Sequence, residues 1–521
     1  MSTAAETLAK QLAQAGVQRA FGVTGSGASL ALIQALARQN IPYHAAQHEA
    51  SAALMAGACG FDGQLRAASI TIKGPGFANA APALLANLYE QRAMVSISEA
   101  YGPETPIWRR HKRLDHAALC ETVAKAYCPT VATDKIADIL ALSSANPPGP
   151  VHLDLWAGSE MPAQIHVATQ HPKSNGAFED LLQRIQAASR PAIALGAGIR
   201  QHPALLKMLQ DLRIPVVTTA AAKGCFDETL PHSAGIITGE TGTYAPETTI
   251  LPQADLVIGL CLSNEEVVAP GAFPAPLVML DNGWAEPRNG FGAEIAVGRT
   301  NLDDIVVPLA DALTAKDWGA DLITKTRADR DDFLKQAGWQ PALALGVLHK
   351  TLPDQTVLIP DTGFHCTMAE TLWPARCGSG FLGSSRARYM GIAIPTAIGR
   401  ALSDPDSPVL CVFGDGGFTP HAFEIALAVQ HNLPILFAYF SDGGYGSVAG
   451  GASDPEIDGA TRFDTNRRWN MVKTLGCTAH RVTDADALTA AVADWTPDQG
   501  PRFVQCNFDP AGYARQAKEM R

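Results

Sequence analysis

The stretch Pro408–Gly446, PVLCVFGDGGFTPHAFEIALAVQHNLPILFAYFSDGGYG, decides the fold of this chain. Val409–Phe413 is a short apolar run with the composition of a buried strand, and a glycine-rich turn follows it directly. Thr419 is predicted to be the N-cap of a helix and Pro420 its first residue, because apolar residues then recur with helical spacing. Ile435–Phe440 is predicted to be a second buried strand, which a second acidic glycine turn ends. This order predicts a βαβ unit with parallel strands.

Two aspartates follow the two predicted strands at matching positions. Neighbouring parallel strands lie about 4.8 Å apart and end at the same edge of a sheet, so Asp415 and Asp442 can reach one ion. Carboxylate and carbonyl oxygens suit Mg²⁺, which also keeps phosphate oxygens as ligands. Gly416 and Gly417 leave their N–H groups unobstructed at a helix N-terminus, where an anion is favoured. The residues thus predict a magnesium-bridged diphosphate, and the alternative is a plain turn between strand and helix.

Length and composition limit the other possibilities. A chain of 521 residues exceeds one ordinary core, so about three domains are expected. The formal net charge of −11 argues against nucleic acid as the main partner. The ten cysteines show no CxxC or Cys/His ligand spacing, which favours reduced thiols. We find no continuous apolar segment of signal-peptide or membrane-spanning type, so we expect a cytoplasmic protein without a membrane partner.

The two acidic turns carry a family resemblance. A GDG motif followed, after a crossover, by a second turn of this kind resembles the thiamine diphosphate-dependent enzymes of acetolactate synthase, benzoylformate decarboxylase and pyruvate decarboxylase type. The resemblance implies that Asp415, Asp442 and the carbonyl of Gly444 hold Mg²⁺. It also places a set of neighbouring residues beside the cofactor, namely Gly414, Gly416, Gly417 and Tyr445. Asp442 departs from the asparagine that is usual there, and it adds a negative charge next to a diphosphate.

Three N-terminal motifs extend the resemblance. FGVTGS ends at Ser26, HEASAALMAGACG contains Glu49, and TIKGPGFAN ends at Asn79. By its position alone, Glu49 could simply favour a helix N-terminus through its charge. The resemblance implies instead that Glu49 hydrogen-bonds the aminopyrimidine of thiamine and drives its activation, while the other subunit holds the diphosphate. It also implies a cofactor contact by Asn79 and a catalytic role for Ser26.

Further motifs follow along the chain. The segment from Trp108 to His116 is a charge run typical of a solvated loop, but in relatives this region carries substrate-selecting residues, which makes His111 a catalytic candidate. DTGFH resembles DVGxH beside the diphosphate, through Gly363 and His365. RYMGIAIPTAIG resembles GxMGxxLPAAIG. There Met390 would bend the cofactor, and the carbonyl of Arg388, at a position that is usually glycine, would accept from its amino group.

The motifs appear in the order expected for an α/β fold with three doubly wound parallel-sheet domains. We predict a pyrimidine-binding domain over 1–163, a central domain over 179–330 and a diphosphate-binding domain over 340–521, with a linker over 164–177. The central range contains no dinucleotide fingerprint, so FAD is not expected.

The resemblance implies an enzyme that acts on the C–C bond next to the carbonyl of a 2-oxo acid. Decarboxylation and acetolactate synthase-like carboligation both remain open. The alternatives are a lyase or hydrolase of a diketone or acyl-CoA, and a non-catalytic binding or regulatory relative. The expected assembly is a homodimer or homotetramer with sites at subunit interfaces. Positive charge at Lys73, Arg109–Arg113 and Arg388 predicts a substrate with a second anionic group.

Overall fold

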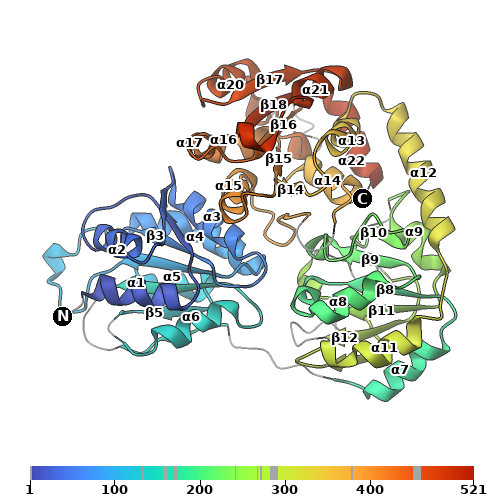
Figure 1. The fold of residues 1–521 in the computed structure, drawn as a ribbon, viewed down its shortest axis with the longest axis horizontal. Coiled ribbons are helices and arrows are strands. Elements are labelled where there is room, and N and C mark those ends of the chain that lie inside the picture. Colours follow the sequence, from blue (N-terminus) through green and yellow to red (C-terminus); the bar gives the residue numbers. More distant parts are fainter. Residues whose placement is uncertain are drawn as a thin grey trace. The chain divides into compact units, whose positions relative to one another are not determined.

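The structure is a computed structural model that describes residues 3–131, 133–156, 161–167, 174–240, 242–266, 268–269, 273–281, 291–376, 380–449 and 459–520. The strands form three sheets (Figure 1). Packing divides the chain into two compact units. The first comprises residues 1–169, 387–406 and 420–435, and the second comprises 170–386, 407–419 and 436–521. The domain limits expected from the sequence stay predictions, whereas the class, three parallel-sheet α/β domains, is confirmed.

The first sheet lies in the first unit and has the strand order β2-β1-β3-β4-β6-β5-β7. Its strands are β1 (Arg19–Gly22), β2 (Tyr43–Ala45), β3 (Ala67–Thr71), β4 (Met94–Glu99), β5 (Ala126–Cys128), β6 (Pro150–Leu155) and β7 (Gln164–Ile165). Only β7 pairs antiparallel among these strands, and it does so at the edge of the sheet. The linker expected from residue 164 onward is therefore wrong at its first two residues, because their backbone pairs with β5.

The helices of the first unit come from both ends of the chain. They are α1 (Ala4–Gln14), α2 (Ala28–Ala37), α3 (Glu49–Cys59), α4 (Pro75–Tyr89), α5 (His116–Val123), α6 (Ile136–Ser144), α15 (Ala393–Ser403) and α17 (Ile425–Gln430). Helix α3 packs closely on α15, because a Cβ atom on Gly399 would lie 2.3 Å from the carbonyl oxygen of Met55. The small residues of α3 allow such an approach, and the partner helix belongs to the same chain.

The second sheet has the order β10-β9-β8-β11-β12-β13, and its pairings are parallel. Its strands are β8 (Pro191–Leu195), β9 (Val216–Thr219), β10 (Ser233–Ile237), β11 (Leu256–Leu260), β12 (Leu277–Asp281) and β13 (Ile295–Gly298). Along β8, Ile193 and Leu195 join one hydrophobic cluster, while Ala192 and Ala194 join another. Successive side chains of a strand point to opposite faces, so both faces of this sheet are covered, as a parallel sheet requires.

The third sheet has the order β14-β15-β16-β18-β17. Its strands are β14 (Val357–Pro360), β15 (Val409–Phe413), β16 (Ile435–Ser441), β17 (Thr478–Val482) and β18 (Arg502–Asn507). The helices of the second unit are α7 (Phe178–Ala187), α8 (Pro203–Gln210), α9 (Pro246–Thr249), α11 (Val306–Leu313), α12 (Ala320–Gln336), α13 (Pro341–Thr351), α14 (Phe364–Leu372), α18 (Gly446–Ala449), α20 (Thr465–Val472), α21 (Ala485–Val492) and α22 (Pro510–Met520). Helix α16 (Asp415–His421) begins in this unit and ends in the first.

The predicted βαβ unit is present, with one correction. Strands β15 and β16 are neighbours, as expected, but the N-cap predicted at Thr419 is wrong because α16 already begins at Asp415. The amide of Phe418 donates to the carbonyl of Gly414, so the glycine turn itself is the first turn of the helix. Pro420 lies inside α16 and cannot donate to the fourth residue before it. The helix soon gives way to the 3-10 turn η7 (Ala422–Glu424).

A buried ion pair lies in the second unit. Lys223 donates to Glu228, with side-chain exposures of 1% and 8%, and Glu228 also accepts from the amide of Ala375 at 3.0 Å. We expect Lys223→Met to destabilise this unit by about 3–5 kcal/mol, since it leaves a buried carboxylate without its partner. Urea unfolding followed by circular dichroism measures the loss. The double variant Lys223→Met/Glu228→Gln should recover a large part of it, and an equal loss in both variants would contradict the explanation.

Candidate cofactor site

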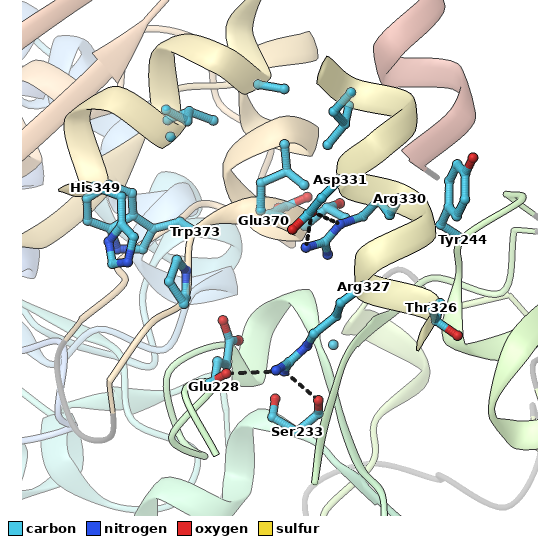
Figure 2. Close-up of a pocket in the computed structure, with 18 of the residues that line it drawn as sticks. Glu228, Ser233, Tyr244, Thr326, Arg327, Arg330, Asp331, His349, Glu370 and Trp373 are labelled. Atoms are coloured by element: carbon cyan, nitrogen blue, oxygen red, sulfur yellow. Dashed lines mark hydrogen bonds and ion pairs between the residues drawn. The ribbon is translucent and has the colours of Figure 1, made fainter. Parts of the chain in front are cut away.

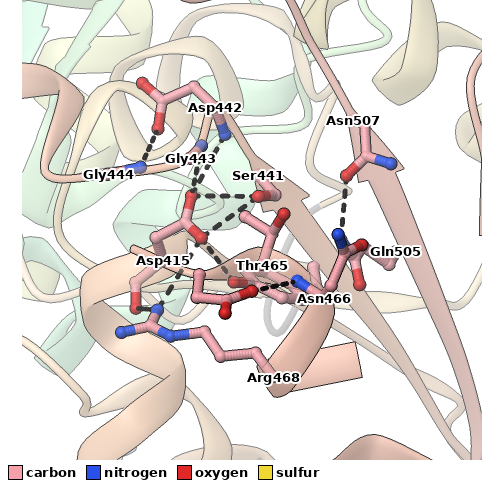
Figure 3. A network of polar contacts seen from close by, with 12 residues as sticks. Asp415, Ser441, Asp442, Gly443, Gly444, Thr465, Asn466, Arg468, Gln505 and Asn507 are labelled. Carbon is pink, nitrogen blue, oxygen red and sulfur yellow. Dashed lines mark hydrogen bonds and ion pairs between the residues drawn. The ribbon is translucent and has the colours of Figure 1, made fainter. Parts of the chain in front are cut away.

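Asp415 is the centre of a polar network at the ends of β15 and β16 (Figure 3). Its carboxylate is 2% exposed and accepts from the Tyr439 hydroxyl. The Ser441 hydroxyl donates to both carboxylate oxygens at 3.1 Å. The amides of Asp442 and Gly443 each donate to Oδ2 at 3.1 Å. Because β16 runs beside β15, the end of β16 supplies Tyr439 and Ser441, and the turn directly after it supplies Asp442 and Gly443. The carboxylate is thus fixed in one orientation.

Asp442 is brought next to Asp415 as predicted, but its carboxylate points elsewhere. In Figure 3 the Asp442 carboxylate turns toward the loop, where its Oδ1 accepts from the amide of Gly444 at 3.3 Å. Burial, and after it the charge of Asp415, raises the pKa of Asp442 to about 6. A carboxylate whose charge is disfavoured by burial and by a neighbouring carboxylate is stabilised by a hard divalent cation. The residues therefore fit Mg²⁺ chemically.

Arg468 is a member of this network that the sequence did not reveal. Its guanidinium donates to the main-chain carbonyl of Asp415 and lies 3.7 Å from Oδ1 of the carboxylate. It also lies over the Phe463 ring, 3.6 Å from the centroid. Arg468 comes from α20, more than fifty residues along the chain, and no motif marked it. Its charge opposes part of the negative charge that Asp442 adds.

The glycines of the turn are required by close packing. A Cβ atom on Gly417 would lie 2.6 Å from the Asp361 carboxylate, and one on Gly414 would lie 2.9 Å from the His365 ring. Gly363 is the N-cap residue directly before α14, with a φ of 145°, and faces the same ring. His365 is buried, and its Nε2 has no hydrogen-bond partner among the described residues. Burial lowers the pKa of His365 to about 4, so the ring is neutral at pH 7 and can offer one N–H to a phosphate.

The remaining predicted residues of this loop lie beside Asp442. A Cβ atom on Gly444 would lie 2.2 Å from the carbonyl oxygen of Thr461. The amide of Tyr445 donates to that carbonyl at 2.8 Å, and the Tyr445 ring contacts Phe463 edge-on at 4.6 Å. Gly416 follows Asp415 in the first turn of α16. The structure thus brings the predicted metal and diphosphate residues of the second unit to the ends of its strands.

Glu49 and Asn79 meet in the first unit. Glu49 is the first residue of α3 and half-buried, and its Oε2 accepts from Asn79 Nδ2 at 3.1 Å. His48, not Glu49, is the N-cap, since its ring Nδ1 accepts from the amide of Ala50 at 3.1 Å. The charge of Glu49 in the first turn of α3 still favours the helix N-terminus, so both explanations of this residue stay open.

Glu424 fixes the turn before Glu49 and was also missed by the sequence. It is 1% exposed, and its Oε1 accepts from the amides of Gln47 and His48 at 2.9 and 3.1 Å. In the sequence, only its place nine residues after Asp415 could have drawn attention to it. Since the two amides belong to the residues directly before Glu49, Glu424 is a positioning residue for the start of α3.

Replacing Glu424 tests that role. Glu424→Ala leaves two amides without their acceptor, and we expect a loss of roughly 2–3 kcal/mol in the unfolding free energy, whereas Glu424→Gln keeps an acceptor and loses less. Burial raises the pKa of Glu424 above its ordinary 4.5, so the folded protein holds a proton that the unfolded chain has released. This carboxyl therefore makes folding less favourable as the pH rises above 4.5. Urea titrations at pH 5 and pH 7 measure the unfolding free energy of both proteins. The stability of Glu424→Gln relative to wild type should be greater at pH 7 than at pH 5, and an equal difference in unfolding free energy at the two pH values would contradict this assignment.

The two other catalytic candidates lie in exposed turns of the first unit. Ser26 precedes α2, and its carbonyl accepts from the Ser29 hydroxyl at 3.1 Å. His111 lies in the basic loop, with its Nδ1 2.9 Å from the Tyr101 hydroxyl. The structure places neither of them in contact with Glu49, and both assignments stay predictions.

Two of the positive residues expected near the substrate already have partners within the protein. Lys73 forms an ion pair with Glu99 at 2.7 Å, and Glu99 also accepts from the amide and hydroxyl of Ser29. Arg110 donates to main-chain carbonyls of its own loop. The positive charge of Lys73, which lies in the turn after β3, is thus balanced by a residue at the end of β4. The sequence could not show this pair because the fold alone brings the two residues together.

Arg388 and Met390 belong to the first unit. Arg388 has a φ of 47°, a left-handed conformation that glycine adopts most readily. The backbone thus keeps the shape that suits the glycine usual at this position. Met390 is 38% exposed, which is uncommon for a long apolar side chain packed only into a core. Its exposure agrees with the predicted contact to a cofactor, which stays a prediction.

A second polar cluster lies in the first unit, away from the predicted residues. Asp154 is near His116 at 2.7 Å and His152 at 3.3 Å, and it accepts from the Tyr127 hydroxyl at 2.6 Å. These groups are buried, and Asp154 has three partners that can donate to it. Because His116 is the first residue of α5, we assign the cluster the structural role of fixing where this helix begins.

Comparison with known proteins gives the class. Residues 2–106, 178–286 and 361–506 match, in that order, the N-terminal TPP binding domain, the central domain and the C-terminal TPP binding domain of thiamine pyrophosphate enzymes. The chain belongs to this family. It is similar to the probable acetolactate synthase large subunit of Methanococcus aeolicus, with 24% identity over 85% of this chain and 81% of the relative.

Two further relatives have the same level of similarity. The large subunit of acetolactate synthase isozyme 1 of Escherichia coli is 24% identical over 86% of this chain and 83% of its own length. Acetolactate synthase of Bacillus subtilis is 24% identical over 97% of this chain and 93% of its own. These comparisons confirm the recognition of a thiamine diphosphate-dependent enzyme. Among the described residues, no helix combines the length and the hydropathy needed to cross a membrane.

Proposed function

We propose that this thiamine diphosphate-dependent enzyme requires Mg²⁺ and makes or breaks the C–C bond next to the carbonyl of a 2-oxo acid. The observation that carries the proposal is the fixed Asp415 carboxylate beside Asp442. The two residues lie at the ends of the neighbouring strands β15 and β16, where the glycine-rich helix α16 begins. When bound, the cofactor supplies a carbon nucleophile and an electron sink. The protein supplies binding, orientation and proton transfer.

Each group of residues has a proposed task toward the cofactor. Asp415, Asp442 and the carbonyl of Gly444 would hold Mg²⁺, with Tyr439 and Ser441 keeping Asp415 oriented. Outer partners of this kind commonly matter nearly as much as the ligands. The glycine N–H groups at the start of α16 and the neutral ring of His365 would face the diphosphate.

Glu49 has the proposed role of moving a proton at the pyrimidine ring. It is a half-buried carboxylate whose Oε2 is oriented by Asn79, which leaves Oε1 for a ligand. A carboxyl can give and retake a proton within hydrogen-bond reach of its partner. The proposal includes a homodimer or homotetramer in which Glu49 of one subunit meets the cofactor held through Asp415 of another.

We also propose that the central domain needs no FAD. At the carboxyl end of β8, the amide of Ala197 donates to the buried carboxylate of Glu266 at 3.0 and 3.2 Å, and Glu266 pairs with Arg386 at 2.8 Å. The protein's own carboxylate thus takes an N–H group of the turn that a nucleotide phosphate would need. Full activity of flavin-free protein supports this, and a requirement for added FAD contradicts it.

The substrate is proposed to be a 2-oxo acid with a second anionic group, which the Arg109–Arg113 cluster and Arg388 recognise. We expect Arg388→Met to reduce the preference for a 2-oxo diacid over pyruvate by about ten- to a hundredfold, the value of a charge-assisted hydrogen bond. Competition assays with 2-oxoglutarate and pyruvate measure this ratio. A preference for pyruvate that Arg388→Met leaves unchanged would contradict the second anionic group.

The experiment that tests the reaction is a panel of 2-oxo acids incubated with enzyme, thiamine diphosphate and Mg²⁺. Release of CO₂ with an aldehyde product identifies a decarboxylase, and release with a longer hydroxyketone identifies a carboligase. Cofactor-dependent turnover of at least one acid is expected. Turnover of none, in protein that binds the cofactor, would contradict the proposed reaction while leaving the family assignment intact.

A further inference from the structure

A pocket of about 480 Å³ lies in the second unit, away from the ends of the strands that carry Asp415. Its walls come from the start of β10, from α12 and α13, and from the carboxyl end of α14. Figure 2 shows Arg327 and Arg330 extending from α12 on one side, with His349 and Trp373 on the other. A volume of this size is typical of sites for small molecules.

Positive charge predominates in the pocket. Five cationic and three acidic side chains line it. Burial, followed by the charge of Arg330, lowers the pKa of Arg327, and Arg330 also acts on the buried Lys223. The charge of Arg330 thus acts on both of the other two cationic groups. Such a group is stabilised when an anion binds among them.

The three cations differ in how strongly their present partners hold them. Lys223 is held by the buried Glu228, and Arg327 donates to the main-chain carbonyls of Glu228 and Ser233 at 3.2 and 2.7 Å. Arg330, whose side chain is 20% exposed, pairs with Asp331, whose side chain is 53% exposed. Water screens the Asp331 carboxylate, so this pair is weaker than the buried pair of Lys223 with Glu228, and Arg330 is the cation of the three that a ligand displaces most easily.

The rest of the lining is apolar and aromatic. Ile323 and Leu334 of α12, Leu343 and Val347 of α13, and Leu372 and Trp373 at the end of α14 contribute to it. Such a wall suits a short hydrocarbon body, and the cations suit one negative group on it.

We propose that this pocket binds a small monocarboxylic acid with an apolar body, whose carboxylate pairs with Arg330. The site goes beyond the proposed function, since it lies outside the residues assigned to the cofactor. Helix α14 runs between the two places: it begins at Phe364 directly after Gly363 of the predicted diphosphate site, and it ends at Leu372 in the pocket. A nine-residue helix is about 13 Å long, so a ligand here contacts the far end of an element that also serves the cofactor.

The test uses the full-length protein with thiamine diphosphate and Mg²⁺ present, titrated by calorimetry with 3-methylbutanoate. This probe has no 2-oxo group and is not a substrate of the proposed reaction. We expect saturable binding at one site per chain. The neutral isostere 3-methylbutanamide and the cation 3-methylbutylammonium should each bind at least tenfold more weakly.

Two variants locate the site. Arg330→Gln should weaken the binding of 3-methylbutanoate by tenfold or more. Gly346 of α13 lines the pocket, and a Cβ atom there would have no atom within 4 Å. Gly346→Phe should therefore fill the space and abolish binding, while Gly346→Ala adds only a methyl group and should bind the probe normally. Lys325→Met, on an exposed position of α12, is the matched loss of a charge and should also bind normally.

The proposal is overturned if wild type does not bind 3-methylbutanoate, if the amide binds as tightly as the acid, or if Arg330→Gln and Gly346→Phe both bind as wild type does. The same titration without thiamine diphosphate separates this result from the proposed function. Binding of the probe depends on the pocket alone, so it is expected even in protein that fails to bind the cofactor.

Discussion

Replacing Asp415 with alanine is expected to abolish the binding of thiamine diphosphate. At the ends of β15 and β16, the Asp415 carboxylate accepts hydrogen bonds from Tyr439, Ser441 and two main-chain amides. Loss of an outer partner of a metal ligand commonly costs about 10–100-fold in metal affinity, so loss of the ligand itself should cost more. Calorimetric titration of thiamine diphosphate with Mg²⁺ present measures the effect.

Two variants control for damage to the fold. Asp415→Asn keeps the shape, and its one amide oxygen can still accept from the amides of Asp442 and Gly443 while the NH2 group faces the hydroxyls of Tyr439 and Ser441, which can accept. A loss of binding in this variant therefore reports the missing charge rather than a disordered loop. Asp442→Asn keeps an oxygen donor and removes the charge that makes Asp442 unusual, so it should bind at least as well as wild type. If Asp415→Ala binds the cofactor normally, the metal site is misassigned.

Replacing Glu49 with glutamine is expected to slow proton exchange at the thiazolium C2 of the bound cofactor by orders of magnitude. Glutamine preserves the shape and the contact with Asn79, but it cannot give or take the proton. Cofactor affinity should change little, because the diphosphate and metal residues are untouched. Exchange into deuterated buffer, followed by NMR after acid quenching, measures the rate. An unchanged rate would remove Glu49 from the account.

The same variant tests whether two chains build one site. Glu49→Gln and Asp415→Ala subunits are each expected to be inactive. A heterodimer of the two contains one site in which both residues are intact, so mixing after mild dissociation should restore part of the activity. The control is a mixture of Glu49→Gln subunits with differently tagged Glu49→Gln subunits, which should stay inactive. Lack of recovery in verified heterodimers indicates sites made within one chain.

Local sequence patterns predicted much of this molecule. The apolar runs at β15 and β16 and the glycine turns after them gave the βαβ unit, because strand ends in a parallel sheet meet at one edge. The start of α16 was misplaced, since the Thr419-Pro420 signal is a common helix start but the GDGG turn already formed the first helical turn. A tertiary constraint, the contact of Gly417 with Asp361, overrides the local signal there.

The residues that the sequence missed are partners from distant segments. Arg468 reaches Asp415 from α20, Glu424 holds the amides before Glu49, and Glu99 balances Lys73. None of these pairs has a local spacing that a motif could mark, because the fold alone brings them together. The partner of Lys73 could not be foreseen for the same reason, and the expectation of positive charge near the substrate stays a prediction. A positive residue read from the sequence carries no information about its partner.

The central claim is that the protein binds thiamine diphosphate through its metal residues and activates it. The most direct measurement is the rate of C2 proton exchange in the cofactor bound to wild-type protein, compared with free cofactor at the same pH, with Mg²⁺ and with a chelator. It requires no knowledge of the substrate. We predict exchange faster by orders of magnitude in the presence of Mg²⁺ and loss of the acceleration with the chelator. Bound cofactor that exchanges no faster than free cofactor would contradict the account.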